Sequence, residues 1–231
     1  MKKTLFSLVG LAAFLGVVSC NTNNDDNVTP PISYVGIVHA TPDAGNVDVY
    51  LNGGLAAQNF AYGSDTGYYA VNPGSYNLQV APTGTTSYVL NTSISLAPGT
   101  AYSVFTIDSL SAIKAAVVTD SFTIPSTDSV MVRFFHFSPD APAVDVVVSD
   151  GTTWFGNRTF NDQEATKSYQ AFTKIKAGTY SVNVNAAGTS TVLLPVPALT
   201  LQGGKVYTLY AKGFATGTGV QALGVGTLQH N

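Results

Sequence analysis

The sequence predicts an all-β protein built as two tandem antiparallel β-sandwich domains. Three observations support this prediction. Apolar and polar residues alternate over short segments, and no stretch sustains the 3.6-residue period of a helix. Turns that contain Gly or Pro separate these segments at the spacing typical of a sandwich. Most of the chain after residue 32 also occurs twice, in the same order.

The composition indicates a neutral, polar surface. The 231 residues include 13 acidic and 10 basic ones, and charged residues make up 10% of the chain, well below the ~25% of an average globular protein. Hydrophobic residues make up 45%, which is an ordinary share and sufficient for a core. These values exclude a basic nucleic-acid binder and a charge-rich disordered chain. The single Cys excludes a small domain stapled by disulfides.

Residues 1–20 have the pattern of a lipoprotein signal peptide. Two lysines precede an apolar stretch over residues 5–18, which is too short to span a bilayer comfortably. The stretch ends in Val-Val-Ser-Cys20, which resembles the bacterial lipobox, where the Cys is acylated and becomes the mature N-terminus. Cys20 is the only Cys in the chain, so we expect lipidation there rather than an ordinary signal peptide that happens to contain a Cys. The lipid would hold the exported protein on a membrane.

Residues 21–32 are expected to form a polar tether, because they are rich in Asn and contain two adjacent prolines near their end. Asp25 and Asp26 resemble the acidic export signal of Bacteroidetes lipoproteins that reach the outer face of the outer membrane. We therefore expect an outer-membrane lipoprotein. Its location on the cell surface or on the periplasmic face stays open.

Three segments of the first domain have clear strand patterns. Residues 47–51 and residues 75–80 alternate between apolar and polar side chains, which predicts half-buried strands. Residues 102–107 have apolar side chains on both faces, which predicts a central strand. With the turns between such segments, we expect roughly seven strands per domain in an immunoglobulin-like or prealbumin-like sandwich.

The repeat is clearest in a motif of the form His-x-[Ser/Thr]-Pro-Asp-Ala-x-x-Val-Asp-Val, which occurs at residues 39–49 and again at residues 136–146. A period of roughly 100 residues indicates domain duplication rather than a solenoid, whose repeats run to ~20–50 residues. We place the first domain at residues 33–124 and the second at residues 125–231, with a short polar linker at their boundary. Two further pairs of matching segments are residues 73–80 with 177–184 and residues 96–105 with 201–210.

These segments resemble the DUF4397 family of bacterial extracytoplasmic domains, whose hallmark is this motif with a Pro after the Ala, followed by Gly-x-Tyr strands. The second copy matches at every motif position, whereas the first has Gly45 where the family has Pro. The resemblance covers nearly the whole chain from Ser33 onward. It implies an exported, often lipid-anchored, β-sandwich-like domain, and it implies no activity.

The motif supplies the one cluster of ionisable residues that merits a functional interpretation. A His and two carboxylates can ligate a divalent metal or form an acid–base pair. The structural interpretation, which we favour, is that Pro and Asp form a turn. The Asp side chain would bond backbone N–H groups two residues on, the His would cap the turn, and the second Asp would accept from the His. The residues concerned are His39, Asp43 and Asp48 in the first copy, and His136, Asp140 and Asp145 in the second.

Other candidates are weaker. The sequence lacks a Gly-x-Ser-x-Gly elbow, a P-loop, a His-Glu-x-x-His pair and a dinucleotide-binding glycine pattern. Glu164 is the only Glu, which excludes a glycosidase site made of two Glu residues. Trp154 is expected in a core rather than on a sugar-binding surface, and His230 is expected to fray.

We therefore expect a lipid-anchored, extracytoplasmic and non-enzymatic protein with a binding or envelope-structural function and no cofactor. Its expected partners are the membrane, through the lipid, and a glycan or an envelope protein, but not nucleic acid. The alternative is a metal-binding protein or metal-dependent enzyme that uses the repeated His/Asp motif. A third possibility is a spacer that binds nothing.

Overall fold

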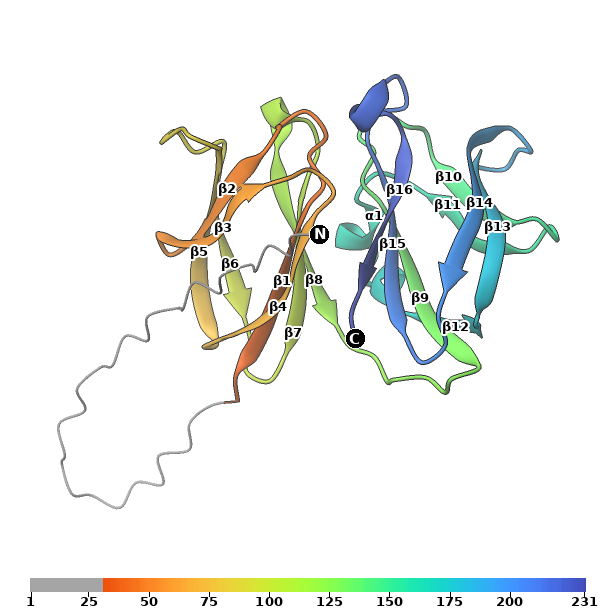
Figure 1. Cartoon of the computed structure of the whole chain (residues 1–231), viewed down its shortest axis with the longest axis horizontal. Helices are drawn as coiled ribbons and strands as arrows, with labels where there is room; N and C mark the ends of the chain where they lie inside the picture. The colour runs from red at the N-terminus through yellow and green to blue at the C-terminus, as the bar shows by residue number, and fades with distance from the viewer. Residues whose placement is uncertain (1–30) are drawn as a thin grey trace, which may run out of the picture.

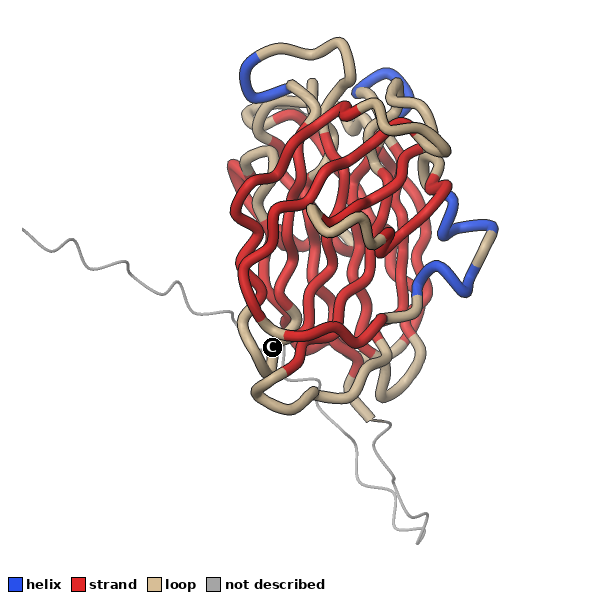
Figure 2. Tube along the Cα trace, turned by 90° about the vertical axis from the view of Figure 1, so that its right-hand side faces the viewer, coloured by secondary structure: helices blue, strands red, loops and turns tan. Residues whose placement is uncertain are grey.

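The computed structural model describes residues 31–231, so the predicted signal peptide, Cys20 and most of the tether lie outside the described residues. The described chain forms sixteen strands in four four-stranded sheets, which confirms the all-β prediction (Figure 1). The few helical turns are short and lie at the margins of the strands (Figure 2). Over residues 31–231, no helix has the length and apolar character needed to cross a membrane.

The first unit contains eight strands, one more than the roughly seven expected. Its two sheets have the strand orders β4-β1-β7-β8 and β3-β2-β5-β6. A 3-10 turn, η1 (Leu110–Ala112), lies between the last two strands. The strands are β1 (Ser33–His39), β2 (Val47–Leu51), β3 (Gly54–Phe60), β4 (Asp65–Val71), β5 (Gly74–Pro82), β6 (Leu90–Leu96), β7 (Ala101–Ile107) and β8 (Lys114–Asp120).

The second unit repeats this arrangement strand for strand, with the orders β12-β9-β15-β16 and β11-β10-β13-β14. It adds a short helix, α1 (Asp162–Ala165), and two 3-10 turns, η2 (Lys167–Gln170) and η3 (Gly219–Gln221). The strands are β9 (Ser129–His136), β10 (Val144–Val148), β11 (Thr153–Arg158), β12 (Thr173–Lys176), β13 (Gly178–Ala186), β14 (Val192–Leu201), β15 (Val206–Lys212) and β16 (Gly224–Gln229).

One pair of strands in each unit departs from the predicted antiparallel arrangement. β1 runs parallel to β7, and β9 runs parallel to β15, whereas the other pairs are antiparallel. Tight hairpins impose antiparallel pairing only on strands that follow each other directly. The chain between β1 and β7 passes through the other sheet, so this constraint does not apply to that pair.

Each unit has its own apolar core between its two sheets. In the first unit, the predicted alternation of β2 is confirmed, because Val47 and Val49 are fully buried against Val35 and Val104 of the facing sheet. Burial of such side chains contributes ~1.5–3 kcal/mol each. The second unit has an equivalent core, in which Trp154 is partly buried and packs edge-on against Tyr180, with the ring centroids 4.8 Å apart, as the sequence predicted.

A third core lies between the two units, which the sequence analysis did not anticipate. The sheets that contain β1 and β9 face each other, so the molecule is a stack of four sheets (Figure 1). We call these two the inner sheets and the other two the outer sheets. Phe105 of the first unit packs on Phe135 and Phe137 of the second, with ring centroids 5.9 and 4.9 Å apart. This shared core explains why β7 is buried on both faces.

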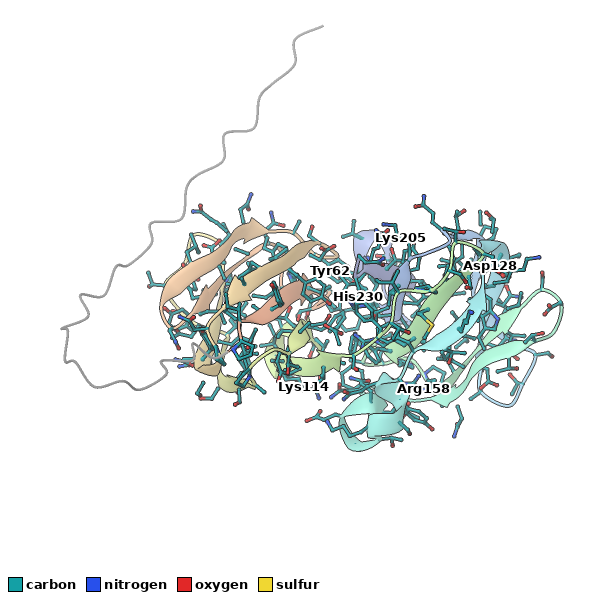
Figure 3. The ribbon with its side chains drawn as sticks, turned by 90° about the horizontal axis from the view of Figure 1, so that it is seen from below. Tyr62, Lys114, Asp128, Arg158, Lys205 and His230 are labelled. Carbon is teal, nitrogen blue, oxygen red and sulfur yellow. The ribbon has the colours of Figure 1, made fainter. Side chains whose placement is uncertain are left out.

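Two cations cross the boundary between the units in opposite directions. Lys212 of the second unit lies 4.4 Å from the ring centre of Tyr62, and Lys114 of the first unit lies 4.8 Å from that of Phe160 (Figure 3). Residues 121–128 connect β8 to β9, and the boundary predicted from the sequence falls in this segment. Contacts on both flanks of the shared core therefore join the units.

Candidate functional site

His39 is the last residue of β1 and lies fully buried. Its Nε2 donates to the Gly45 carbonyl at 2.8 Å, so its Nδ1 is free to accept from the Thr106 hydroxyl at 3.2 Å and from the Thr41 N–H at 3.4 Å. Burial lowers the pKa of His39, against the opposing effect of the Gly45 carbonyl. The neutral ring therefore holds the motif loop against the inner sheet.

His136 occupies the same place in the second unit with two partners fewer. Its Nε2 donates to the Pro142 carbonyl at 3.0 Å, but its buried Nδ1 has no hydrogen-bond partner. The strand register explains the difference, because Thr106 pairs with His39 whereas Ala211 pairs with His136. Burial again lowers the pKa of the histidine.

The first Asp of each motif holds a loop that is distant in the sequence. Asp43 accepts from the Leu110 N–H at 2.7 Å, and Asp140 accepts from the Ala215 N–H at 2.6 Å and from the Thr216 hydroxyl at 2.9 Å. Burial acts to raise the pKa of Asp140, but these donors outweigh it and lower the pKa. The expected bond to a backbone N–H two residues on is wrong, because in each unit the loop after β7 or β15 returns to the carboxylate.

The second Asp of each motif lies on the opposite face of its strand from the core. Asp48 accepts from the Asn59 N–H at 2.7 Å and from the Thr83 hydroxyl at 3.1 Å, and Asp145 accepts from the Asn157 N–H at 2.7 Å. The prediction that this Asp accepts from the histidine is therefore wrong. The alternation of β2 and β10 explains the error, since the flanking valines occupy the core face.

The motif residues thus hold separate loops rather than one shared centre. Across residues 31–231, no three His, Cys, Asp or Glu side chains lie in positions that could hold a metal ion. Each of the six motif side chains is instead hydrogen-bonded to its own chain. Their hydrogen bonds hold the motif segment to neighbouring loops and strands.

A second polar group, absent from the sequence predictions, lies between the inner sheets. We call it the interface ring: Asp120 at the end of β8, Arg133 of β9, Thr208 of β15, His230 after β16 and Tyr68 of β4. Arg133 donates to Asp120 through Nη2 and to the Thr208 hydroxyl through Nε at 2.7 Å. Thr208 lies 2.7 Å from His230 Nε2, and Tyr68 bonds both His230 Nδ1 and Asp120, the latter at 2.7 Å.

The donors and acceptors of the interface ring are consistent with a neutral His230. The Tyr68 hydroxyl donates to Asp120, so it accepts from the protonated Nδ1 of His230, and the unprotonated Nε2 accepts from the Thr208 hydroxyl. Burial and the charge of Arg133 lower the pKa of His230 to about 3. The expectation that His230 frays is wrong, because its side chain is buried and its backbone N–H bonds the Val206 carbonyl at 2.9 Å.

The charged pair at the centre of the ring is deeply buried. The side chains of Asp120 and Arg133 are both fully inaccessible to solvent. Burial raises the pKa of Asp120, while the guanidinium of Arg133 and the hydroxyls of Tyr68 and Ser103 act in the opposite direction. The signal that could have revealed this group is a single Arg inside the apolar strand Val-Met-Val-Arg-Phe-Phe.

Comparison with known proteins adds a family for part of the chain. Residues 33–147 match DUF4397, a domain of unknown function. The DUF4397 match covers the whole first unit and continues through β9 into β10, so it includes both copies of the motif. The resemblance predicted from the sequence is confirmed over these residues, and a second DUF4397 copy stays a prediction. No curated protein matches the chain.

Proposed function

We propose that this protein is an exported lipoprotein of the outer membrane, in which two DUF4397-like units act together as a non-enzymatic binding or envelope-structural module. Lipid on Cys20 would anchor it, and residues 21–32 would connect the anchor to β1. Its partners would be the membrane and a glycan or envelope protein. Nucleic acid and cofactors have no part in this proposal.

The observation that supports this proposal most strongly is the state of the six motif side chains. A general acid, a general base or a metal ligand must be free to contact substrate or metal. His39 and His136 are fully buried, and the four carboxylates accept hydrogen bonds from backbone N–H groups of loops and neighbouring strands. These six side chains are therefore hydrogen-bonded within the fold instead of being free to contact a substrate or a metal.

The anchoring part of the proposal is tested by labelling cells with a radioactive fatty acid and comparing the wild type with Cys20→Ser. We expect label on the wild-type protein only. Equal labelling of both proteins, or none on either, would contradict the lipid anchor. Protease treatment of intact cells then distinguishes the two locations: digestion without lysis indicates the cell surface, and protection indicates the periplasmic face.

The non-enzymatic part is tested by metal analysis of the purified protein. We expect less than stoichiometric zinc, manganese or calcium, and no difference between the wild type and Asp140→Asn. A stoichiometric metal that is lost in Asp140→Asn would favour the metal-dependent alternative. Asp150→Asn is the matched control, because Asp150 is an exposed turn residue outside the motif.

A further inference from the structure

We propose that the solvent-facing side of the first unit's outer sheet binds a neutral carbohydrate chain. This inference rests on the proposed binding function and names the face and the class of ligand. We call the surface the tyrosine face and define it by Tyr50, Leu55, Gln79, Tyr88 and Asn91.

The register of the outer sheet places these residues in one row. Val47 and Val49 face the core, so Tyr50 between the core positions of β2 faces solvent. Tyr50 pairs with Leu55 on β3 and with Gln79 on β5, and Gln79 pairs with Asn91 on β6. The row therefore crosses all four strands of the sheet.

Two tyrosine rings pack against each other on the tyrosine face. The ring of Tyr88, in the loop before β6, lies 5.8 Å from that of Tyr50 at an angle of 72°. Tyr88 is 45% exposed and Leu55 is 49% exposed, and with Tyr50 they place three large side chains on one face of the sheet, where a cluster is more informative than a single exposed apolar residue. The rings offer flat apolar surface, and the amides beside them offer both donors and acceptors.

The tyrosine face has no exposed charged side chain on its strands, which favours a neutral ligand over a charged one. The four strands contain one charged residue, Asp48, which is only 7% exposed and accepts from Asn59 and Thr83. A surface without cations does not attract phosphate groups of nucleic acid or lipid. A sugar ring presents apolar C–H groups on its faces and hydroxyls around its edge. It therefore complements a tyrosine ring flanked by Gln and Asn side chains.

The second unit shows that the fold does not require the tyrosine face. At the equivalent register of its outer sheet, Val147 pairs with Thr153 and with Asn183, and Asn183 pairs with Pro195. This row has the same strand order but no aromatic ring. The pairing of the half-buried Tyr50 with the exposed Tyr88 on one of two sheets with the same topology therefore indicates a role other than folding.

The test uses the purified mature protein and an array of neutral and acidic glycans. We expect binding to at least one neutral glycan and an affinity at least tenfold lower in the double variant Tyr50→Val, Tyr88→Ser. Valine is the residue that the second unit has at this register, so it keeps the strand propensity of β2. The matched control is Val147→Ala, Thr153→Ala, which we expect to bind within twofold of the wild type.

Three outcomes would overturn this inference. They are the binding of no neutral glycan, the binding of acidic glycans alone, and undiminished binding by the Tyr50→Val, Tyr88→Ser variant. A melting temperature within a few degrees of the wild type verifies that the variant is folded. Fatty-acid labelling of Cys20 and the metal content are independent of this face. The inference can therefore fail while the proposed anchored, non-enzymatic function stands.

Discussion

The two motif histidines show how one residue type can have unequal surroundings in two similar units. Both rings donate through Nε2 to a loop carbonyl, but only His39 also accepts through Nδ1, from the Thr106 hydroxyl and the Thr41 N–H. The second unit has Ala211 at the position of Thr106 and leaves Nδ1 of His136 without a partner. An unpaired buried polar atom costs ~1–3 kcal/mol. The first unit's histidine is therefore the better satisfied of the two.

Replacing Thr106 with Val should weaken the binding of His39 Nδ1, which would keep only the 3.4 Å bond from the Thr41 N–H. The substitution keeps the shape of the side chain and removes the hydroxyl that donates to His39 Nδ1. We expect the free energy of unfolding to fall by about 0.5–1.5 kcal/mol, the net contribution of one hydrogen bond, measured by chemical denaturation. Thr227→Val is the control, because Thr227 is exposed on β16, and its effect should stay within about 0.5 kcal/mol. Equal effects of the two substitutions would contradict this account.

His39 should also make stability depend on pH. Burial lowers its pKa in the folded state below the ordinary value of 6.5, so below pH 6.5 the unfolded chain binds a proton more readily than the folded chain does. Its contribution is therefore complete well above pH 6.5 and declines as the pH falls through this value. His39→Gln does not titrate, so the wild type should lose stability relative to this variant as the pH falls below 6.5, by at most about 1.4 kcal/mol per pH unit, the limit for one proton. Denaturation at pH 8, 6 and 5 measures this difference in stability, and a constant difference would contradict the prediction.

At the scale of the strand, the sequence predicts central strands well and edge strands poorly. β2, β5 and β7 have a core on at least one side, so their apolar residues alternate or fill both faces. β4 is an edge strand with little burial, and α1 has only four residues, so neither has a periodic pattern to detect. The parallel pairing of β1 with β7 depends on the route of the chain, which local alternation does not encode.

Glycines of β16 give a prediction at this scale. A Cβ on Gly226 would lie 2.2 Å from the ring of Tyr210, which is buried in the shared core, so the ring would have to move. We expect Gly226→Ala to lower the free energy of unfolding by ~1–3 kcal/mol. Gly224→Ala in the same strand is the control, because its Cβ would have its nearest contact at 3.8 Å. Thermal melts of both variants test this prediction, and similar melting temperatures would contradict it.

At the scale of the whole molecule, the sequence revealed the repeat but not how its two halves meet. The repetition of the motif identified its residues. Their hydrogen-bond partners, however, lie far along the chain: Leu110 for Asp43, and Ala215 for Asp140. The members of the interface ring are likewise distributed from β4 to the residue after β16. Alternation within a strand cannot show which distant side chains meet across two facing sheets.

The buried pair of Asp120 and Arg133 should dominate the coupling between the units. Asp120→Asn leaves the guanidinium buried without a counter-charge, and the expected loss of unfolding free energy is ~3–5 kcal/mol. The control is Asp108→Asn, which removes a partly exposed pair with Lys114 and should cost less than about 1 kcal/mol. Chemical denaturation of both variants provides the comparison. Equal losses of unfolding free energy in the two variants would contradict the prediction that the buried pair contributes more than the exposed pair.

The four-sheet stack also determines how such a molecule can engage its surroundings. The two inner sheets cover each other, so the two outer sheets look away from one another at opposite ends of the long axis (Figure 1). One flat surface cannot touch both ends at once while the shared core is intact. The duplication therefore gives no avidity on a single flat target. A ligand held at each end would instead make the protein a rigid bridge whose span is set by the thickness of four sheets.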